Sequence, residues 1–170
     1  MKYLVVSDSH GDRDVLSQLV KQYRHQVDYF FHCGDSELDE NDRLWDIMIG
    51  IKGNCDLANI VEERSFNTGD DNLYVVHGDE LVGDGDLLTL ALNAESNGAN
   101  IALYGHTHVP YVEYDKDRDI LLVNPGSISL PRQQSGEATY AIIESSPEQY
   151  QVTFYSRDNE ALGTKTIERA

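Results

Sequence analysis

Five short apolar segments of the chain each end beside a glycine and a residue type that can bind a metal ion. The segment ends are Ser7-Asp8-Ser9-His10-Gly11, Gly34-Asp35, Gly53-Asn54, His77-Gly78 and Gly105-His106-Thr107-His108. Residues two apart at a strand end point the same way, and glycine lets the backbone turn sharply beside a bound group. A His-x-His pair alone is a modest signal and also fits two solvated loop histidines, but the recurrence indicates several strands that finish at one place.

The N-terminal part of the chain predicts strands and helices in alternation. Residues 2–6 and 27–32 are apolar runs, and residues 13–24 between them have helical spacing, with Asp12 placed to cap the helix. A strand, a helix and a strand in this order imply a right-handed parallel unit. Further strands are predicted at 47–51, 60–66, 73–76 and 101–104, and a helix is predicted over 85–97. Because the carboxyl ends of parallel strands share one sheet edge, the candidate ligands should converge there.

The C-terminal part has a different pattern, with short strand candidates and no helical stretch between them. The candidates are residues 111–114, 120–123, 139–144, 152–155 and 164–167. This half favours hairpins and antiparallel pairing. No internal repeat, low-complexity segment or linker interrupts the chain, so we expect one domain over residues 1–170.

The charge balance bears on the class of partner. The chain has 13 Lys+Arg against 30 Asp+Glu and a formal net charge of −17, which argues against stable nucleic-acid binding. The sequence shows neither an apolar run of membrane length nor the pattern of a signal peptide. With two cysteines, Cys33 and Cys55, a cytoplasmic setting is expected.

The candidate ligands comprise four imidazoles, two carboxylates and one carboxamide, which is more than one ion requires. They suit two ions with one carboxylate between them. Nitrogen and oxygen ligands without a thiolate indicate manganese, iron, zinc or a similar divalent ion in an open site.

The five ordered segments resemble the five sequence blocks of the calcineurin-like metallophosphoesterase family. Asn124-Pro125-Gly126-Ser127 resembles a further motif of its small bacterial and archaeal phosphodiesterase branch. This resemblance implies an α/β fold, a four-layer αββα sandwich with two mixed β-sheets. It also implies that Asp8, His10, Asp35 and His108 hold a first metal ion, and that Asp35, Asn54, His77 and His106 hold a second.

The implied activity is that of a metal-dependent phosphoesterase, above all a phosphodiesterase. Two divalent ions, Mn²⁺ in the first place with Fe, Zn, Ni or Mg as alternatives, would activate a bridging hydroxide for attack on phosphorus. Asp35, Asn54 and His77 would act through that hydroxide on a small phosphate ester. The alternative is a protein-binding scaffold of the same fold, which has no need of a complete ligand set. A homodimer or higher homo-oligomer stays open.

One position departs from the family pattern. Many members have a histidine directly after the metal-binding asparagine, whereas here Cys55 and then Asp56 follow Asn54. A thiol with an ordinary pKa of about 8.5 is a weak proton donor at neutral pH, so the general acid stays unassigned. We interpret His32 as a packed histidine behind the site and the acidic stretch 35–42 as a solvated loop. Asp79 is either a support for a ligand or a loop charge, and Arg132 is either a phosphate contact or a surface charge.

Overall fold

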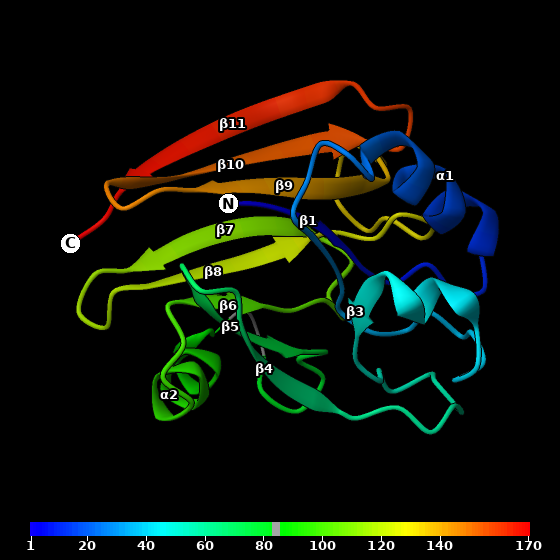
Figure 1. Ribbon diagram of the computed structural model, residues 1–170, viewed down its shortest axis with the longest axis horizontal. Coiled ribbons are helices and arrows are strands. Elements are labelled where there is room, and N and C mark those ends of the chain that lie inside the picture. Colours follow the sequence, from blue (N-terminus) through cyan, green and yellow to red (C-terminus); the bar gives the residue numbers. More distant parts are fainter. Residues whose placement is uncertain (83–85) are drawn as a thin grey trace.

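The protein is described by a computed structural model over residues 1–82 and 86–170. Two mixed β-sheets pack face to face, and one helix covers the outer face of each sheet (Figure 1). This arrangement confirms the predicted four-layer αββα sandwich.

The larger sheet has six strands in the order β11-β10-β9-β1-β2-β3. Their bounds are β1 Lys2–Val6, β2 Tyr29–His32, β3 Met48–Gly50, β9 Thr139–Ser145, β10 Gln149–Ser156 and β11 Ala161–Glu168. β1, β2 and β3 are parallel, while β9, β10 and β11 are antiparallel to their neighbours. Helix α1 (Arg13–Tyr23) connects β1 to β2, and a short 3₁₀ helix, η1 (Arg43–Asp46), precedes β3.

The smaller sheet has five strands in the order β4-β5-β6-β8-β7. Their bounds are β4 Glu63–Asn67, β5 Asn72–Val76, β6 Ile101–Leu103, β7 Pro110–Asp115 and β8 Ile120–Pro125. Helix α2 (Leu88–Ser96) lies within the predicted 85–97, of which residue 85 lies outside the described residues. The β7–β8 hairpin is antiparallel as predicted, but β8 also pairs in parallel with β6. Local pattern does not reveal that pairing, because packing against distant strands decides it.

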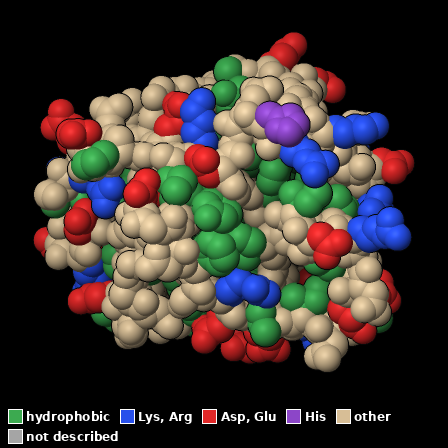
Figure 2. Space-filling view, viewed as in Figure 1, with side chains coloured by type: hydrophobic (Ala, Val, Ile, Leu, Met, Phe, Trp, Pro, Cys, Tyr) green, Lys and Arg blue, Asp and Glu red, His purple; other side chains and the backbone are tan. Residues whose placement is uncertain are grey.

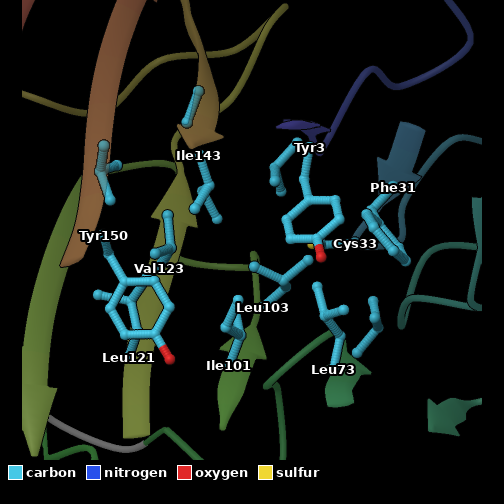
Figure 3. Packing of buried hydrophobic residues seen from close by; sticks show 14 of the residues in the cluster. Tyr3, Phe31, Cys33, Leu73, Ile101, Leu103, Leu121, Val123, Ile143 and Tyr150 are labelled. Atoms are coloured by element: carbon cyan, nitrogen blue, oxygen red, sulfur yellow. The ribbon is translucent and has the colours of Figure 1, made fainter. Parts of the chain in front are cut away.

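The main core lies between the two sheets (Figure 3). Tyr3 and Ile143 of the larger sheet face Leu103, Leu121 and Val123 of the smaller one, and all five are fully buried. Burying such side chains stabilises the fold by about 1.5–3 kcal/mol each. This apolar layer fixes the sheets against each other, so the loops at their common edge also have fixed relative positions.

Helix α1 packs through its apolar face, whereas α2 buries Leu90, Ala91 and Ala94 and leaves Leu88 and Leu92 exposed. Asp12 caps α1, since its carboxylate accepts a hydrogen bond from the Val15 N–H at 3.3 Å. The buried side of α1 packs on Leu4, Val6 and Tyr140 of the larger sheet. α2 ends at Ser96, two residues before Gly98, whose φ of +68° places it in the left-handed region.

One face of the molecule carries side chains of several types. On the face in Figure 2, acidic, basic and hydrophobic side chains are interspersed, and the negative charge is not gathered into one patch. None of the described helices is long and apolar enough to cross a membrane.

Candidate metal centre

All seven predicted ligands lie in the loops at one edge of the sandwich, where parallel strands of both sheets end. They are Asp8 and His10 after β1, Asp35 after β2, Asn54 after β3, His77 after β5, and His106 and His108 after β6. The buried core beneath this edge holds the strands in place, so the loops present their side chains to a common space.

The backbone of these loops is unusual. Asp8, His10, Asp35, His106 and His108 all have φ between 44° and 69°, in the left-handed region that residues other than glycine seldom adopt. Each such residue costs on the order of 1–2 kcal/mol, and clusters of them occur where function constrains the chain. The conformation turns successive side chains inward, which an ordinary strand extension would not do.

Two glycines permit close contact between the loops. A Cβ on Gly53 would overlap the carboxylate and the backbone nitrogen of Asp35. A Cβ on Gly105 would overlap the side chains of Ser7 and Asp8. These glycines are therefore required by the approach of neighbouring loops, which explains why glycine stands beside the candidate ligands.

The first group of candidate ligands is Asp8, His10 and His108. His108 Nε2 lies 3.2 Å from Asp8 Oδ1, and His10 Nε2 lies 3.9 Å from the same oxygen. The two Nε2 atoms are 3.4 Å apart. The predicted fourth member, Asp35, contributes Oδ2 at 4.0 Å from His10 Nε2.

A hydrogen bond at Nδ1 of His108 and of His10 determines which ring nitrogen carries the proton. His108 Nδ1 lies 2.6 Å from the Leu130 carbonyl oxygen, and His10 Nδ1 lies 3.1 Å from Glu37 Oε2. Both partners only accept, so each neutral ring carries its proton on Nδ1 and turns the Nε2 lone pair toward the other ring and toward Asp8. Three acceptors facing one another repel unless a proton or a cation lies among them. The donor set therefore fits a divalent cation.

The second group is centred on His77 and Asp35. His77 Nδ1 lies 2.7 Å from the Cys33 carbonyl oxygen, which leaves Nε2 facing Asp35 Oδ2 at 3.2 Å and Asp8 Oδ1 at 3.8 Å. Among the described residues, Asp8 Oδ1 and His77 Nε2 are buried side-chain atoms without a hydrogen-bond partner of good geometry. Buried polar atoms are nearly always satisfied, so these two indicate a place for an ion.

Asn54 and His106 complete this second group on its exposed side. Asn54 Oδ1 lies 3.2 Å from His106 Nδ1, and the rings of His77 and His106 are 5.2 Å apart between centroids. The His106 N–H also donates to Asp8 Oδ2 at 3.1 Å. Asp35 Oδ2 lies 4.0 Å from His10 Nε2 and 3.2 Å from His77 Nε2, so it lies between the two groups, and Asp8 Oδ1 lies near imidazoles of both groups as well.

The pKa values show how the protein alone balances these charges. Burial lowers the pKa of His77, but the carboxylates of Asp35 and Asp8 outweigh it and raise the value to about 9. The Asp8 carboxylate likewise raises the pKa of His108. Burial opposes ionisation of Asp35, yet the His77 ring and the Cys55 N–H lower its pKa to about 2. Protons on imidazoles therefore take the place of metal charge in the free chain, and they compete with a metal ion.

Two acidic residues support the site, and their roles do not follow from the strand-end pattern. Asp56 is 4% exposed, and its carboxylate accepts backbone N–H groups from Asp35 at 2.9 Å, Glu37 at 2.7 Å and Gly53 at 2.7 Å. This occupied carboxylate faces backbone, which disfavours Asp56 as the general acid. Glu37 is exposed, as expected for the solvated loop 35–42, and its Oε2 also lies 3.1 Å from His10 Nδ1.

The remaining sequence candidates divide between support and surface. His32 is fully buried, accepts the Gly34 N–H at Nδ1 (3.1 Å), and its Nε2 lies 2.9 Å from Ser9 Oγ, so it packs behind the ligand loops as predicted. Burial lowers its pKa to about 4, which keeps it neutral. The Arg132 N–H donates to the His108 carbonyl oxygen.

The Asn-Pro-Gly-Ser segment ties two ligand loops together. Asn124 Nδ2 donates to the Gly105 carbonyl oxygen at 3.0 Å, and Ser127 Oγ donates to the Asp8 carbonyl oxygen at 2.7 Å. The segment therefore acts on the backbone that carries Asp8 and His106, and a direct metal contact is not needed to explain it.

A cleft of about 530 Å³ adjoins the metal centre and includes Asn54 in its wall. Its other polar lining residues are Lys52, Asp56, Glu62, Glu63, Asp79, Glu80 and Asn93. The volume is in the range of small-molecule sites. Asp79 therefore lies beside the candidate substrate space.

Comparisons with known proteins agree with this geometry. Residues 1–148 match the model of the calcineurin-like phosphoesterase superfamily domain. A Bacillus subtilis protein named probable metallophosphoesterase YsnB is 35% identical over 158 residues, which is 92% of this chain and 92% of that protein. A crystal structure from Streptococcus pneumoniae, titled as a conserved protein and predicted phosphoesterase, has a TM-score of 0.93 at 35% identity and covers 99% of this chain and 97% of its own. A crystal structure of a single mutant of Vps29 from Entamoeba histolytica has a TM-score of 0.75 at 17% identity and covers 99% of both chains, which shows a shared fold.

Proposed function

Because the chain belongs to the calcineurin-like phosphoesterase superfamily, we propose that it is a phosphodiesterase dependent on two divalent metal ions. The observation that carries the proposal is the set of facing acceptors, in which Asp8 Oδ1 and His77 Nε2 are buried without a hydrogen-bond partner of good geometry among the described residues. Asp8, His10, Asp35 and His108 would hold one ion, and Asp35, Asn54, His77 and His106 the other, with Mn²⁺ as the first candidate. When bound, such a pair of ions supplies a hydroxide nucleophile and neutralises charge on the phosphoryl oxygens.

The chain's own residues would orient and tune this centre. The Cys33, Leu130 and Glu37 oxygens hold the three imidazole rings with Nε2 toward the ions, and such support raises the basicity of a ligand. The Cys55 N–H donates to Asp35 Oδ1 at 2.8 Å and fixes the carboxylate shared by both ions. No covalent enzyme intermediate is required, so an ester with two substituents is acceptable.

The electrostatics of the cleft favour a diester over a monoester. Glu62, Glu63, Asp79 and Glu80 line the cleft, with Lys52 as a single opposing charge. A diester carries one negative charge and a monoester close to two, so the carboxylates repel the monoester more.

Proton donation to the leaving group is the weak step in this site. Burial and the nearby carboxylate of Asp35 raise the pKa of the Cys55 thiol above its ordinary value, so the thiol is a poor acid at neutral pH. General acid catalysis contributes about 10²–10⁴-fold. Aryl diesters, whose leaving groups need little protonation, should therefore be hydrolysed much faster than alkyl diesters.

The test is kcat/KM for an aryl diester, an alkyl diester of equal charge and an aryl monoester, with the metal-free chain and added Mn²⁺. We expect the aryl diester to be the fastest substrate and Asp35→Asn to abolish its turnover, while Asp28→Asn on the exposed surface serves as the matched control. A faster monoester would contradict the diesterase assignment.

The alternative hypothesis, a protein-binding scaffold of the same fold, has one observation in its favour, which is the fold shared with Vps29. Absence of turnover of all three esters, with two ions bound per chain, would favour that hypothesis.

A further inference from the structure

Cys55 lies at the mouth of the metal centre and has no part in the ligand sets described above. Its sulfur and ligand atoms of His10 and Asp35 all lie within 4.8 Å of one another. The side chain is exposed, and Sγ lies 3.7 Å from Asn54 Nδ2. Three strand ends thus bring a nitrogen, an oxygen and a sulfur donor to one place.

The surroundings of Cys55 favour a cation. A carboxylate oxygen of Asp35 lies within 4.8 Å of its sulfur, and Glu37 Oε2 lies 3.1 Å from Nδ1 of the neighbouring His10 ring. These carboxylates attract a divalent ion. Asp8 Oδ1, which is fully buried and has no hydrogen-bond partner of good geometry among the described residues, lies 3.9 Å from His10 Nε2 and indicates a cation beside that ring.

The preference of each metal ion for sulfur, nitrogen or oxygen donors decides which ion would bind the Cys55 sulfur. Thiolates bind soft ions such as Cd²⁺ and also Zn²⁺, whereas Mn²⁺ prefers oxygen and imidazole donors. A hard ion is therefore satisfied by carboxylates and imidazoles and leaves the thiol free. A soft ion gains a strong bond by moving toward Cys55.

We propose that His10, Asp35 and Cys55 form a position for a thiophilic divalent ion at the mouth of the centre, distinct from the two positions of the family site. On binding, the S–H bond breaks, the sulfur electron pair forms the bond to the ion, and the proton leaves to solvent without oxidation or reduction. Because His10 and Asp35 are shared, this ion competes with the first hard ion. This competition should inhibit ester hydrolysis, and that expectation rests on the proposed function. The binding of the thiophilic ion does not rest on it.

Cys33 provides a matched control within the same chain. It is fully buried in the core beside Tyr3 and Phe31 (Figure 3). Its alkylation therefore reports unfolding, whereas alkylation of Cys55 reports access to the mouth of the site.

The experiment measures the alkylation rates of both cysteines by peptide mass spectrometry in metal-free wild-type protein, with Mn²⁺ or with Cd²⁺. We expect Cd²⁺ at about ten times its Kd to slow Cys55 alkylation about tenfold, because only the free fraction reacts. Mn²⁺ should leave the rate within about twofold, since manganese disfavours thiolate. Equal protection by Mn²⁺, or no protection by Cd²⁺, would overturn the proposal.

A binding measurement keeps the test independent of activity. By calorimetry, Cys55→Ser should lower the Cd²⁺ affinity at least about tenfold and leave the Mn²⁺ affinity within about threefold. Ultraviolet absorption from a thiolate–Cd²⁺ bond should appear in wild type and Cys33→Ala and be absent in Cys55→Ser. Unchanged Cd²⁺ affinity in Cys55→Ser would overturn the proposal. Protection by Cd²⁺ in a chain that hydrolyses no ester would refute the proposed function while retaining this site.

Discussion

Replacing Asp56 should destabilise the protein far more than replacing an ordinary surface aspartate. The Asp56 carboxylate is buried and accepts three backbone N–H groups from the loops after β2 and β3. Each buried donor left without a partner costs about 1–3 kcal/mol. Asp56→Ala should therefore lower the free energy of unfolding by about 3–9 kcal/mol, a large part of the roughly 5–15 kcal/mol of a typical domain.

Asp56→Asn should lower the free energy of unfolding less than Asp56→Ala does, for a reason that lies in the hydrogen-bond geometry. Oδ2 accepts the N–H groups of Asp35 and Gly53, whereas Oδ1 accepts only that of Glu37. An amide oxygen at the Oδ2 position keeps two bonds, while the amide nitrogen faces the Glu37 N–H. The expected loss is about 2–4 kcal/mol, from one missing bond, one donor left unsatisfied and the removed charge.

The assay is urea unfolding of the chelator-treated protein, followed by circular dichroism. Asp28→Ala is the matched control, because its exposed carboxylate accepts one backbone N–H, from Lys2 at 2.7 Å. It should cost less than about 1 kcal/mol. If Asp56→Ala unfolds within 1 kcal/mol of wild type, or if asparagine is worse than alanine, the reasoning is refuted.

Three further outcomes are expected. Glu37→Ala should weaken Mn²⁺ binding in calorimetry by about 10–100-fold and Glu37→Gln by less, because an amide oxygen still accepts the His10 Nδ1 proton; an effect equal to that of the surface control Glu148→Gln would contradict this role. The folded-state pKa of His77, about 9, is raised from its ordinary 6.5, so its stabilisation of the metal-free chain is complete below pH 6.5 and is lost as pH rises to about 9, and Mn²⁺ affinity should rise over the same range. A pH-independent affinity and melting temperature would oppose this account. Elemental analysis should find two ions per chain in wild type and fewer in Asp35→Asn, and full activity with one ion would refute the paired site.

The strands and candidate ligands were accessible to sequence reasoning because their signals are local. Apolar runs predicted the strands, and glycines beside His10, Asp35, Asn54, His77 and His106 marked the ligand loops. The pairing of β9 with β1 and of β8 with β6 was not accessible, because contacts between segments far apart in sequence decide it.

The supporting roles of Asp56 and Glu37 could not be predicted from the sequence either. A carboxylate such as Asp56, which binds backbone groups, has the same local signature as a loop charge. Glu37 differs from the other acids of its loop only in where its backbone, at φ of 55°, directs it. Such roles depend on three-dimensional direction, which composition and spacing leave open.

The left-handed backbone at five candidate ligands has a consequence for how such a site persists through evolution. Glycine at His10 or His106 would relieve on the order of 1–2 kcal/mol of strain, offset in part by about 0.5–1 kcal/mol of unfolded-chain entropy. Loss of a ligand here is therefore close to neutral for folding, or even favourable. Selection for stability alone would therefore not retain these residues, and their retention is expected only if the proposed site has a function.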